Sequence, residues 1–274
     1  MLLFATGFIF NSNLNAKIIT IDENFAVTVN PNDKIIYQKE LETDVNKLYS
    51  MADTNSVSTL STTPVSTQTN ATISYTNGTD SENKELESNS CLQHYLTIER
   101  ESGDIEKYYC MDSFTDIPIS TLKDTTTGEF EIVTPGEGTY DSTYSARAWA
   151  KIHYIQGTRN TSTEYFEYVK ALWFRGTVQQ LDSSVTASNR RIWIRNYGFD
   201  LNTRAFQNLT KGPYYAASGS NTVTRNAPSS FYTLLNSSSY PHEIVCTCQA
   251  DISRSGNTWY LQTTIRECSD GISR

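Results

Sequence analysis

The sequence predicts an all-β protein, an antiparallel β-sandwich (Ig-like or jelly-roll-like) that follows a short N-terminal helix and a disordered linker. Three observations support this prediction. Apolar and polar residues alternate along several runs of the second half, as half-buried strands require. Seventeen tyrosines and many threonines favour pleated strands. Helical periodicity is confined to one short run, and no sequence period indicates a solenoid or propeller.

The first sixteen residues predict a secretory leader. Met1–Phe10 is almost wholly apolar and Asn11–Ala16 is mostly polar and small, which indicates cleavage after Ala16. No Lys or Arg precedes the apolar run, and a buried first strand or an uncleaved anchor is the alternative. The run is shorter than the ~20 residues of a membrane span, and no later segment approaches that length. We therefore expect an extracellular or cell-surface protein with no transmembrane segment after the leader.

Residues 17–51 form the next predicted unit. Two alternating runs, Lys17–Ile21 and Phe25–Val29, precede a turn. Apolar residues recurring at helical spacing then predict a short amphipathic helix within Tyr37–Met51. These residues are Leu41, Val45 and Leu48. The segment is either a propeptide or part of the fold, and its helix either docks on the β body or ends where the linker begins.

Residues 52–90 predict a solvated linker. Ser, Thr and Asn occupy 22 of these 39 positions, and Pro64 and Gly78 interrupt them. Such a composition buries too little apolar surface to offset the entropy of ordering the chain. The β-sandwich domain is accordingly placed at 91–274.

Strand signals recur at regular spacing after residue 91. Glu101–Asp104 predicts a hairpin turn between the first two, and a polar turn is expected at 156–163. Six or more strands with almost no helical period indicate an antiparallel sandwich. The predicted strands are Leu92–Glu99, Ile105–Met111, Phe130–Val133, Tyr144–Ile155, Glu164–Val178, Arg190–Tyr197, Pro213–Ala217, Ser230–Leu235 and a final hairpin over 245–267.

Five cysteines are the disulfide candidates, and their odd number leaves at least one unpaired or bridged to another chain. They are Cys91, Cys110, Cys246, Cys248 and Cys268. One or two disulfides are expected in an oxidising compartment. Cys91 and Cys110 flank two strand-like runs and could meet across a hairpin.

The predicted strand register of the final hairpin indicates which face of the sheet each of the other three cysteines occupies. A two-residue turn with Gly256 first pairs Cys248 with Ile265 and Ile252 with Leu261. Cys246 and Cys248 then face the core, while Cys268 falls on the opposite face, which disfavours a bridge to Cys248. Zinc held by His242 and these cysteines is a minor alternative, because His-x3-Cys-x-Cys is not a common zinc spacing. We predict no metal site.

Candidate catalytic groups are few. The sequence contains no phosphate-binding loop, no GxSxG and no HExxH. His94, His153 and His242 are interpreted as strand residues, and His153, beside Trp149 and Lys151, is the least improbable base. A carboxylate pair for glycoside hydrolysis can be nominated, but no spacing singles one out. The nominated carboxylates are Glu164, Glu167, Asp182 and Asp200. We assign no catalytic residue and no cofactor.

Four tryptophans lie on four predicted strands. If all point inward, they form the core of the sandwich. If two or three point outward from adjacent strands, they form a platform that could stack on sugar rings, and a contiguous exposed patch would mark an interaction surface. The candidate ligand-binding residues are Trp149, Trp173 and Trp193, with Trp259 as the fourth tryptophan.

Two thirds of the chain, from about residue 91 to 268, loosely resembles uncharacterised secreted β-sandwich proteins of Gram-positive bacteria. The resemblance is carried by the strand pair YSARAWAKIHYIQ and TEYFEYVKALWFRGTVQQLDSSV, by WIRNYGF, and by the closing cysteine-containing hairpin. It is a likeness of pattern and order, without a diagnostic motif. It implies export and a β-sandwich, and it transfers no active residues.

These observations favour a secreted, non-enzymatic binding or structural protein whose extracellular ligand or protein partner the sequence does not identify. A net charge of −8 disfavours nucleic acid, which requires a basic surface. A secreted carbohydrate-binding or glycan-processing module is the alternative. A secreted antibacterial toxin is weaker, because it would need a membrane-active segment and none follows residue 16.

Overall fold

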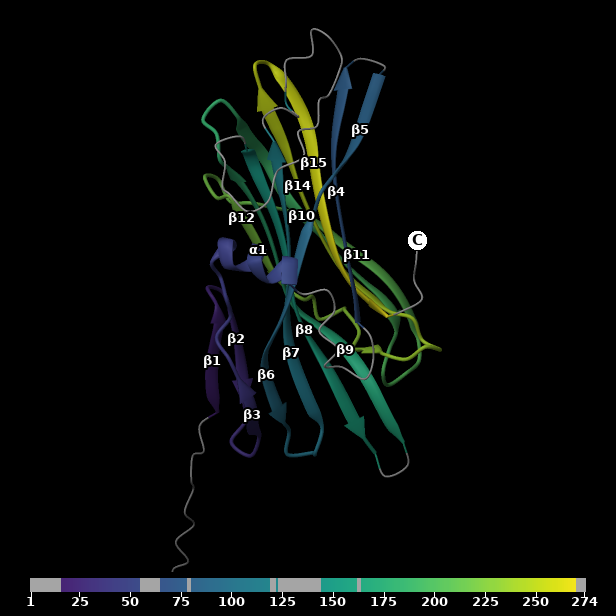
Figure 1. Ribbon diagram of the computed structural model, residues 1–274. Helices are drawn as coiled ribbons and strands as arrows, with labels where there is room; N and C mark the ends of the chain where they lie inside the picture. Colours follow the sequence, from purple (N-terminus) through teal and green to yellow (C-terminus); the bar gives the residue numbers. More distant parts are fainter. Residues whose placement is uncertain are drawn as a thin grey trace, which may run out of the picture.

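The computed structural model describes residues 16–54, 65–77, 80–118, 122, 144–161 and 164–269. Over these residues the protein forms one short helix and three antiparallel sheets, as Figure 1 shows. The prediction of an all-β antiparallel protein with a short helix is confirmed. Its finer assignment to an Ig-like or jelly-roll topology stays a prediction. The predicted leader up to residue 15 and the predicted strand Phe130–Val133 lie outside the described residues.

One sheet has six strands in the order β11-β10-β14-β15-β4-β5. This sheet joins distant parts of the chain, because Val65–Tyr75 of β4 pairs with Trp259–Ser269 of β15. The strands are β4 (Val65–Asn77), β5 (Asp80–Leu86), β10 (Thr186–Phe199), β11 (Phe206–Tyr215), β14 (Glu243–Arg254) and β15 (Asn257–Ser269).

The second sheet has seven strands in the order β12-β9-β8-β7-β6-β3, with β13 paired to β9. Its centre is a meander of long strands, in which β8 pairs with both β7 and β9. The strands are β3 (Lys34–Gln38), β6 (Asn89–Glu99), β7 (Ile105–Pro118), β8 (Tyr144–Asn160), β9 (Tyr165–Gln180), β12 (Thr222–Asn226) and β13 (Leu234–Leu235).

The main core lies between these two sheets. Strand β8 shows why: its small residues Ala146, Ala148 and Ala150 all face this core, and each is fully buried. The final hairpin contributes its own alternating stripe, which includes Leu261 and Ile265. Alternation with period two thus directs one side of each strand to the other sheet and leaves the opposite side facing outward.

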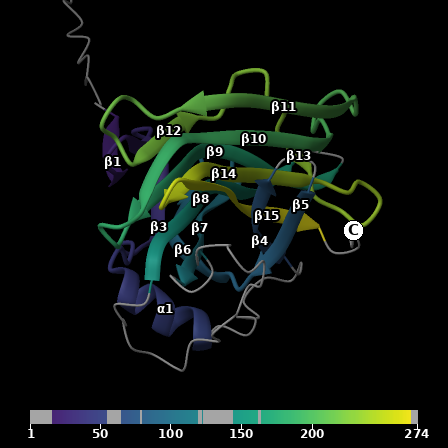
Figure 2. The same ribbon diagram turned by 90° about the horizontal axis from the view of Figure 1, so that it is seen from above.

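Two parts of the N-terminal segment, the hairpin over residues 17–29 and the short helix, cover the outward side of the seven-stranded sheet, and β3 between them joins its edge. Strands β1 (Lys17–Asp22) and β2 (Phe25–Val29) form a two-stranded sheet, and α1 (Val45–Thr54) contacts β6. Figure 2 shows α1 outside the strands, beside β6. Leu48 of α1 is fully buried with Cys91 and Phe114. In this structure the segment is therefore docked on the β body.

The helix begins later than the predicted Tyr37–Met51. Residues 34–38 instead extend as β3 along β6. Asp44 caps the helix, because its Oδ1 accepts hydrogen bonds from the backbone N–H groups of Asn46 (2.8 Å) and Lys47 (3.3 Å). Helical spacing alone therefore identified the helix but placed its start several residues too early.

The predicted linker over 52–90 is wrong where β4 and β5 form. Within β4, Ala71 and Ile73 are buried in the core, opposite Thr263 and Leu261 of β15. Threonine suits a strand, and β4 gains its partner from a segment about 190 residues later in the chain. Local composition does not reveal that partner. The β body therefore begins before residue 91.

Candidate functional site

The predicted ligand-binding tryptophans do not form one platform. Trp149 on β8 and Trp173 on β9 both point to the outward side of the seven-stranded sheet, under the N-terminal segment, where Trp173 is buried. Trp193 on β10 is half-buried on the outward side of the six-stranded sheet. Trp259 is buried in the core. Two separate places therefore hold candidate functional residues.

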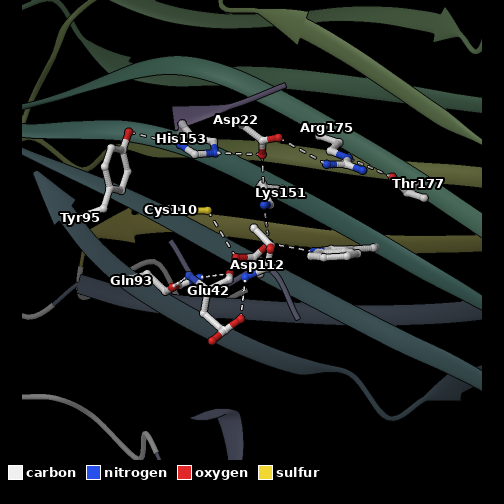
Figure 3. Close-up of polar contacts among 12 residues, drawn as sticks. Asp22, Glu42, Gln93, Tyr95, Cys110, Asp112, Lys151, His153, Arg175 and Thr177 are labelled. Carbon is white, nitrogen blue, oxygen red and sulfur yellow. Dashed lines mark hydrogen bonds and ion pairs between the residues drawn. The ribbon is translucent and has the colours of Figure 1, made fainter. Parts of the chain in front are cut away.

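The first place is a buried charged cluster between β1, β7, β8 and β9 (Figure 3). Lys151 of β8 is fully buried, and its Nζ lies 3.3 Å from Asp22 Oδ2 and 3.5 Å from Asp112 Oδ1. Arg175 Nη1 lies 3.7 Å from Asp22 Oδ1. Two cations thus face two carboxylates, as charges removed from water require.

Neighbouring side chains orient Asp112. The Trp149 Nε1–H donates to Asp112 Oδ1 at 2.8 Å, and the Cys110 thiol donates to Oδ2 at 3.3 Å. The Lys151 ammonium lies 5.2 Å from the Trp149 ring centroid, and the Arg175 guanidinium lies 5.7 Å from it. Trp149 therefore links Asp112 to both cations.

The cluster maintains its charges. Burial alone would raise the pKa of Asp22, but Lys151, the backbone N–H of Glu23 and Arg175 together hold this pKa below its ordinary value. Burial alone would lower the pKa of Lys151, but Asp112, Cys110 and Asp22 raise it above its ordinary value. Both partners are ionised at neutral pH for the same reason, since each stabilises the charge of the other.

His153 adjoins the cluster as a neutral imidazole. It is fully buried beside Trp173 and Phe25, and burial, with Lys151 and Arg175, lowers its pKa to about 3. Its Nδ1 lies 3.2 Å from the Tyr95 hydroxyl. If Tyr95 donates this hydrogen bond, the proton of the neutral ring is on Nε2, which faces Asp22 Oδ2 at 3.9 Å.

The second place is a shallow hollow of about 310 Å³ on the open side of the six-stranded sheet. Trp193 lies in it, and its Nε1–H donates to Gln249 Oε1 at 3.1 Å. Gln249 also accepts from Arg191 Nε at 3.0 Å and donates through Nε2 to Gln262 at 2.9 Å. Amide and hydroxyl groups on β11, β14 and β15 therefore surround one indole ring whose orientation is fixed.

Two arginines border this hollow and share one carboxylate. Arg195 Nη1 lies 3.0 Å from Glu243 Oε2, and Arg266 Nε lies 3.7 Å from Glu243 Oε1. Both arginines remain partly exposed. The hollow therefore carries more positive than negative charge, although the chain as a whole has a net charge of −8.

The disulfide prediction is wrong for this structure, in which all five cysteines are buried free thiols. Strand register explains the result. Cys91 lies opposite Asp112 and Cys110 lies opposite Gln93, so the two are not paired. Cys268 lies opposite Glu243, facing away from Cys246 and Cys248.

The remaining candidate groups are dispersed. Asp182 and Asp200 accept hydrogen bonds within their own turns. His94 bonds within β6, and the His242 imidazole lies 3.1 Å from Glu267. Within the described ranges, no group of three or more His, Cys, Asp and Glu residues is arranged to hold a metal ion. The described helix lacks the length and hydropathy of a membrane span.

Asp22, Asp112 and Arg175 were not among the predicted site residues. The available signal was on β8, where Trp149, Lys151 and His153 share one face, because a stripe that mixes aromatic and charged residues fits a covered surface better than an open one. The chain was compared with protein-family models, with curated proteins and with solved structures, and none of these comparisons found a match.

Proposed function

We propose that this protein is an extracellular binding protein that binds a glycan on the open side of the six-stranded sheet. The observation that carries the proposal is Trp193, held by Gln249 in a hollow lined mostly by polar side chains. An aromatic ring with fixed orientation offers an apolar surface to one face of a sugar ring. The surrounding amides and hydroxyls offer hydrogen bonds to its hydroxyl groups.

The charges of the hollow favour an acidic glycan. Arg195 and Arg266 share Glu243, and the Arg195 Nε–H also donates to Asn208 Oδ1, so their other N–H groups can bind a ligand carboxylate or phosphate. Because Glu243 is engaged by both arginines, the arrangement suits binding better than acid–base chemistry. The proposal is accordingly for binding without a reaction.

Export is part of the same proposal. The predicted cleavage after Ala16 would leave Lys17 as the first residue, and β1 begins at Lys17. Cleavage there would therefore remove none of the described strands. N-terminal sequencing of protein recovered from the culture medium tests this point: a chain that begins at Lys17 supports export, and an intact chain confined to cells contradicts it.

Trp193→Ala tests the binding surface. Mobility of the full chain in native gels containing neutral or acidic polysaccharides gives the ligand class, and titration of the retarding polysaccharide gives the affinity. A central tryptophan contributes about 2 kcal/mol or more to binding, so the variant should bind roughly 30-fold more weakly. Arg266→Gln should weaken binding of acidic polysaccharides only.

The matched control is Tyr215→Ala. Tyr215 is an exposed aromatic residue at the end of β11, outside the hollow, with 57% of its surface accessible. This variant should bind as the wild type does. Equal losses in the Trp193 and Tyr215 variants, or no retardation by any polysaccharide, would refute the proposed surface.

A further inference from the structure

The charged cluster lies under the β1–β2 hairpin, whose Asp22 contacts Lys151 and Arg175. We infer that Lys151, Arg175 and His153 form a binding site for the carboxylate of a sugar acid, and that Asp22 occupies this site until such a ligand displaces the hairpin. The site lies on the opposite sheet from the Trp193 hollow, so the inference goes beyond the proposed function.

Asp22 fills the site incompletely. Of the three groups, only Lys151 Nζ lies within hydrogen-bond distance of its carboxylate, because the separations from Arg175 Nη1 (3.7 Å) and His153 Nε2 (3.9 Å) are too long. The other hydrogen bond to this carboxylate comes from the backbone N–H of Glu23, within the hairpin itself, at 2.8 Å. His153 Nε2 is buried without a hydrogen-bond partner. Buried polar atoms usually have partners, so this nitrogen indicates a missing ligand atom.

The three groups together fit a carboxylate with a neighbouring hydroxyl. Lys151 and Arg175 supply charge and donors for the carboxylate. The Nε2–H of His153 would then donate to the adjacent hydroxyl. Trp173, now stacked against Phe25 with ring centroids 6.1 Å apart, would offer its face to the sugar ring once Phe25 withdraws. A sugar acid combines all three features.

The hairpin that carries Asp22 is attached only by side chains. Strands β1 and β2 pair with each other and with no other described strand. Ile19, Val27 and Val29 bury the inner face of the hairpin. At its base, Asp33 is held by Arg100 Nη1 at 2.7 Å, which fixes the turn after residue 29. The hairpin can therefore pivot where Val29 joins this fixed turn, while β3 and α1 stay in place.

An approach to the site exists beside the hairpin tip. A hollow of about 460 Å³ is lined by Asn24, Trp173, Thr224, Arg225 and Asn226. Asn24 belongs to the turn of the hairpin, and Trp173 contacts His153 from the other side. Arg225 is exposed there and would attract an acidic ligand.

Binding of glucuronate to the full chain tests the inference, with glucose and acetate as comparison ligands at constant ionic strength. Asp22→Ala removes the competing carboxylate, which is tethered at a high effective concentration. We expect Asp22→Ala to bind glucuronate at least ten-fold more tightly than the wild type, to bind acetate more weakly than glucuronate, and not to bind glucose. Glu23→Ala, which removes a neighbouring exposed carboxylate, is the matched control and should behave as the wild type.

Three further measurements keep the inference falsifiable. Asp22→Asn preserves the shape of the side chain and replaces Asp22→Ala if that variant does not fold. Binding should survive in the Asp22→Ala/Trp193→Ala double variant, and its loss there would assign the effect to the open face instead. In the wild type, saturating glucuronate should increase hydrogen exchange across residues 17–29. Equal affinities in wild type and Asp22 variants, binding of glucose, or unchanged exchange would overturn the inference.

Discussion

We expect mild acid to destabilise this protein through His153. The groups that face His153 are Lys151 on its own strand, Arg175 on β9, Asp22 on β1 and Tyr95 on β6. Burial and the two cations lower the pKa of His153 from 6.5 to about 3. The unfolded chain therefore takes up a proton below pH 6.5, while the folded protein does not until about pH 3. The stabilisation is complete above pH 6.5 and is lost as the pH falls between these two values.

One pKa unit corresponds to about 1.4 kcal/mol, so the loss approaches about 5 kcal/mol near pH 3 and is about 2 kcal/mol at pH 5. Urea unfolding at pH 7.5, 6.5 and 5.0 measures it, with His153→Gln as the non-titrating reference. Between pH 7.5 and pH 5.0 the wild type should lose about 2 kcal/mol more free energy of unfolding than the variant. His94 is present in both proteins, so its contribution cancels. Parallel losses in the two proteins would refute the reasoning.

Three further predictions concern the packing of the fold. Leu48→Ala should reduce the free energy of unfolding by about 2–5 kcal/mol in urea, because it leaves a cavity under α1, and a loss below about 1 kcal/mol would show that α1 is not docked as described. Gly157→Ala should destabilise by about 1–3 kcal/mol in the same assay, since the new methyl group would overlap the Tyr168 ring, and a neutral result would contradict this contact. A thiol reagent should detect no accessible cysteine in the folded protein and five after unfolding without reductant, whereas fewer than five would indicate a disulfide.

The free thiols are compatible with export because burial keeps them unreactive. Burial raises the pKa of Cys91 and Cys248 to about 12, and that of Cys110 and Cys246 well above its ordinary value. Thiolate is the form that reacts with oxidants and disulfides. These cysteines therefore act as small apolar residues, and the expectation of disulfides from an oxidising compartment alone did not account for their packing.

The final hairpin shows which features local sequence determines. Its alternating pattern correctly predicted that Cys246, Cys248, Leu261 and Ile265 share the core side. The register was wrong by two residues: Cys248 lies opposite Thr263 rather than Ile265. Ser255 and Gly256, both with positive φ, form the two-residue turn, whereas the prediction began the turn at Gly256. Because a shift of two residues preserves the face of every side chain, the pattern determined the face but not the register.

Strand β4 shows the opposite case, in which composition was misleading. A segment rich in Ser and Thr with few apolar residues satisfies the usual description of a linker. Here β15 supplies a full row of backbone partners, and Ala71 and Ile73 suffice to attach the strand to the core. The remaining side chains of such a strand can stay polar, since one side of the six-stranded sheet is open to solvent. Only the distant partner distinguishes this strand from a linker.

The charged cluster could not be predicted, because its central contact joins residues 129 positions apart in a chain with many possible ion pairs. The need for a covering segment nevertheless follows from β8. A strand with Lys151 and His153 fully buried on its outward side needs a cover that supplies a carboxylate. Asp22 meets that need in this structure, which argues that residues 17–29 belong to the fold. Any ligand that replaced the hairpin would have to bring an acidic group of its own, since Lys151 would otherwise keep only Asp112 and Arg175 would lose its ion pair with Asp22.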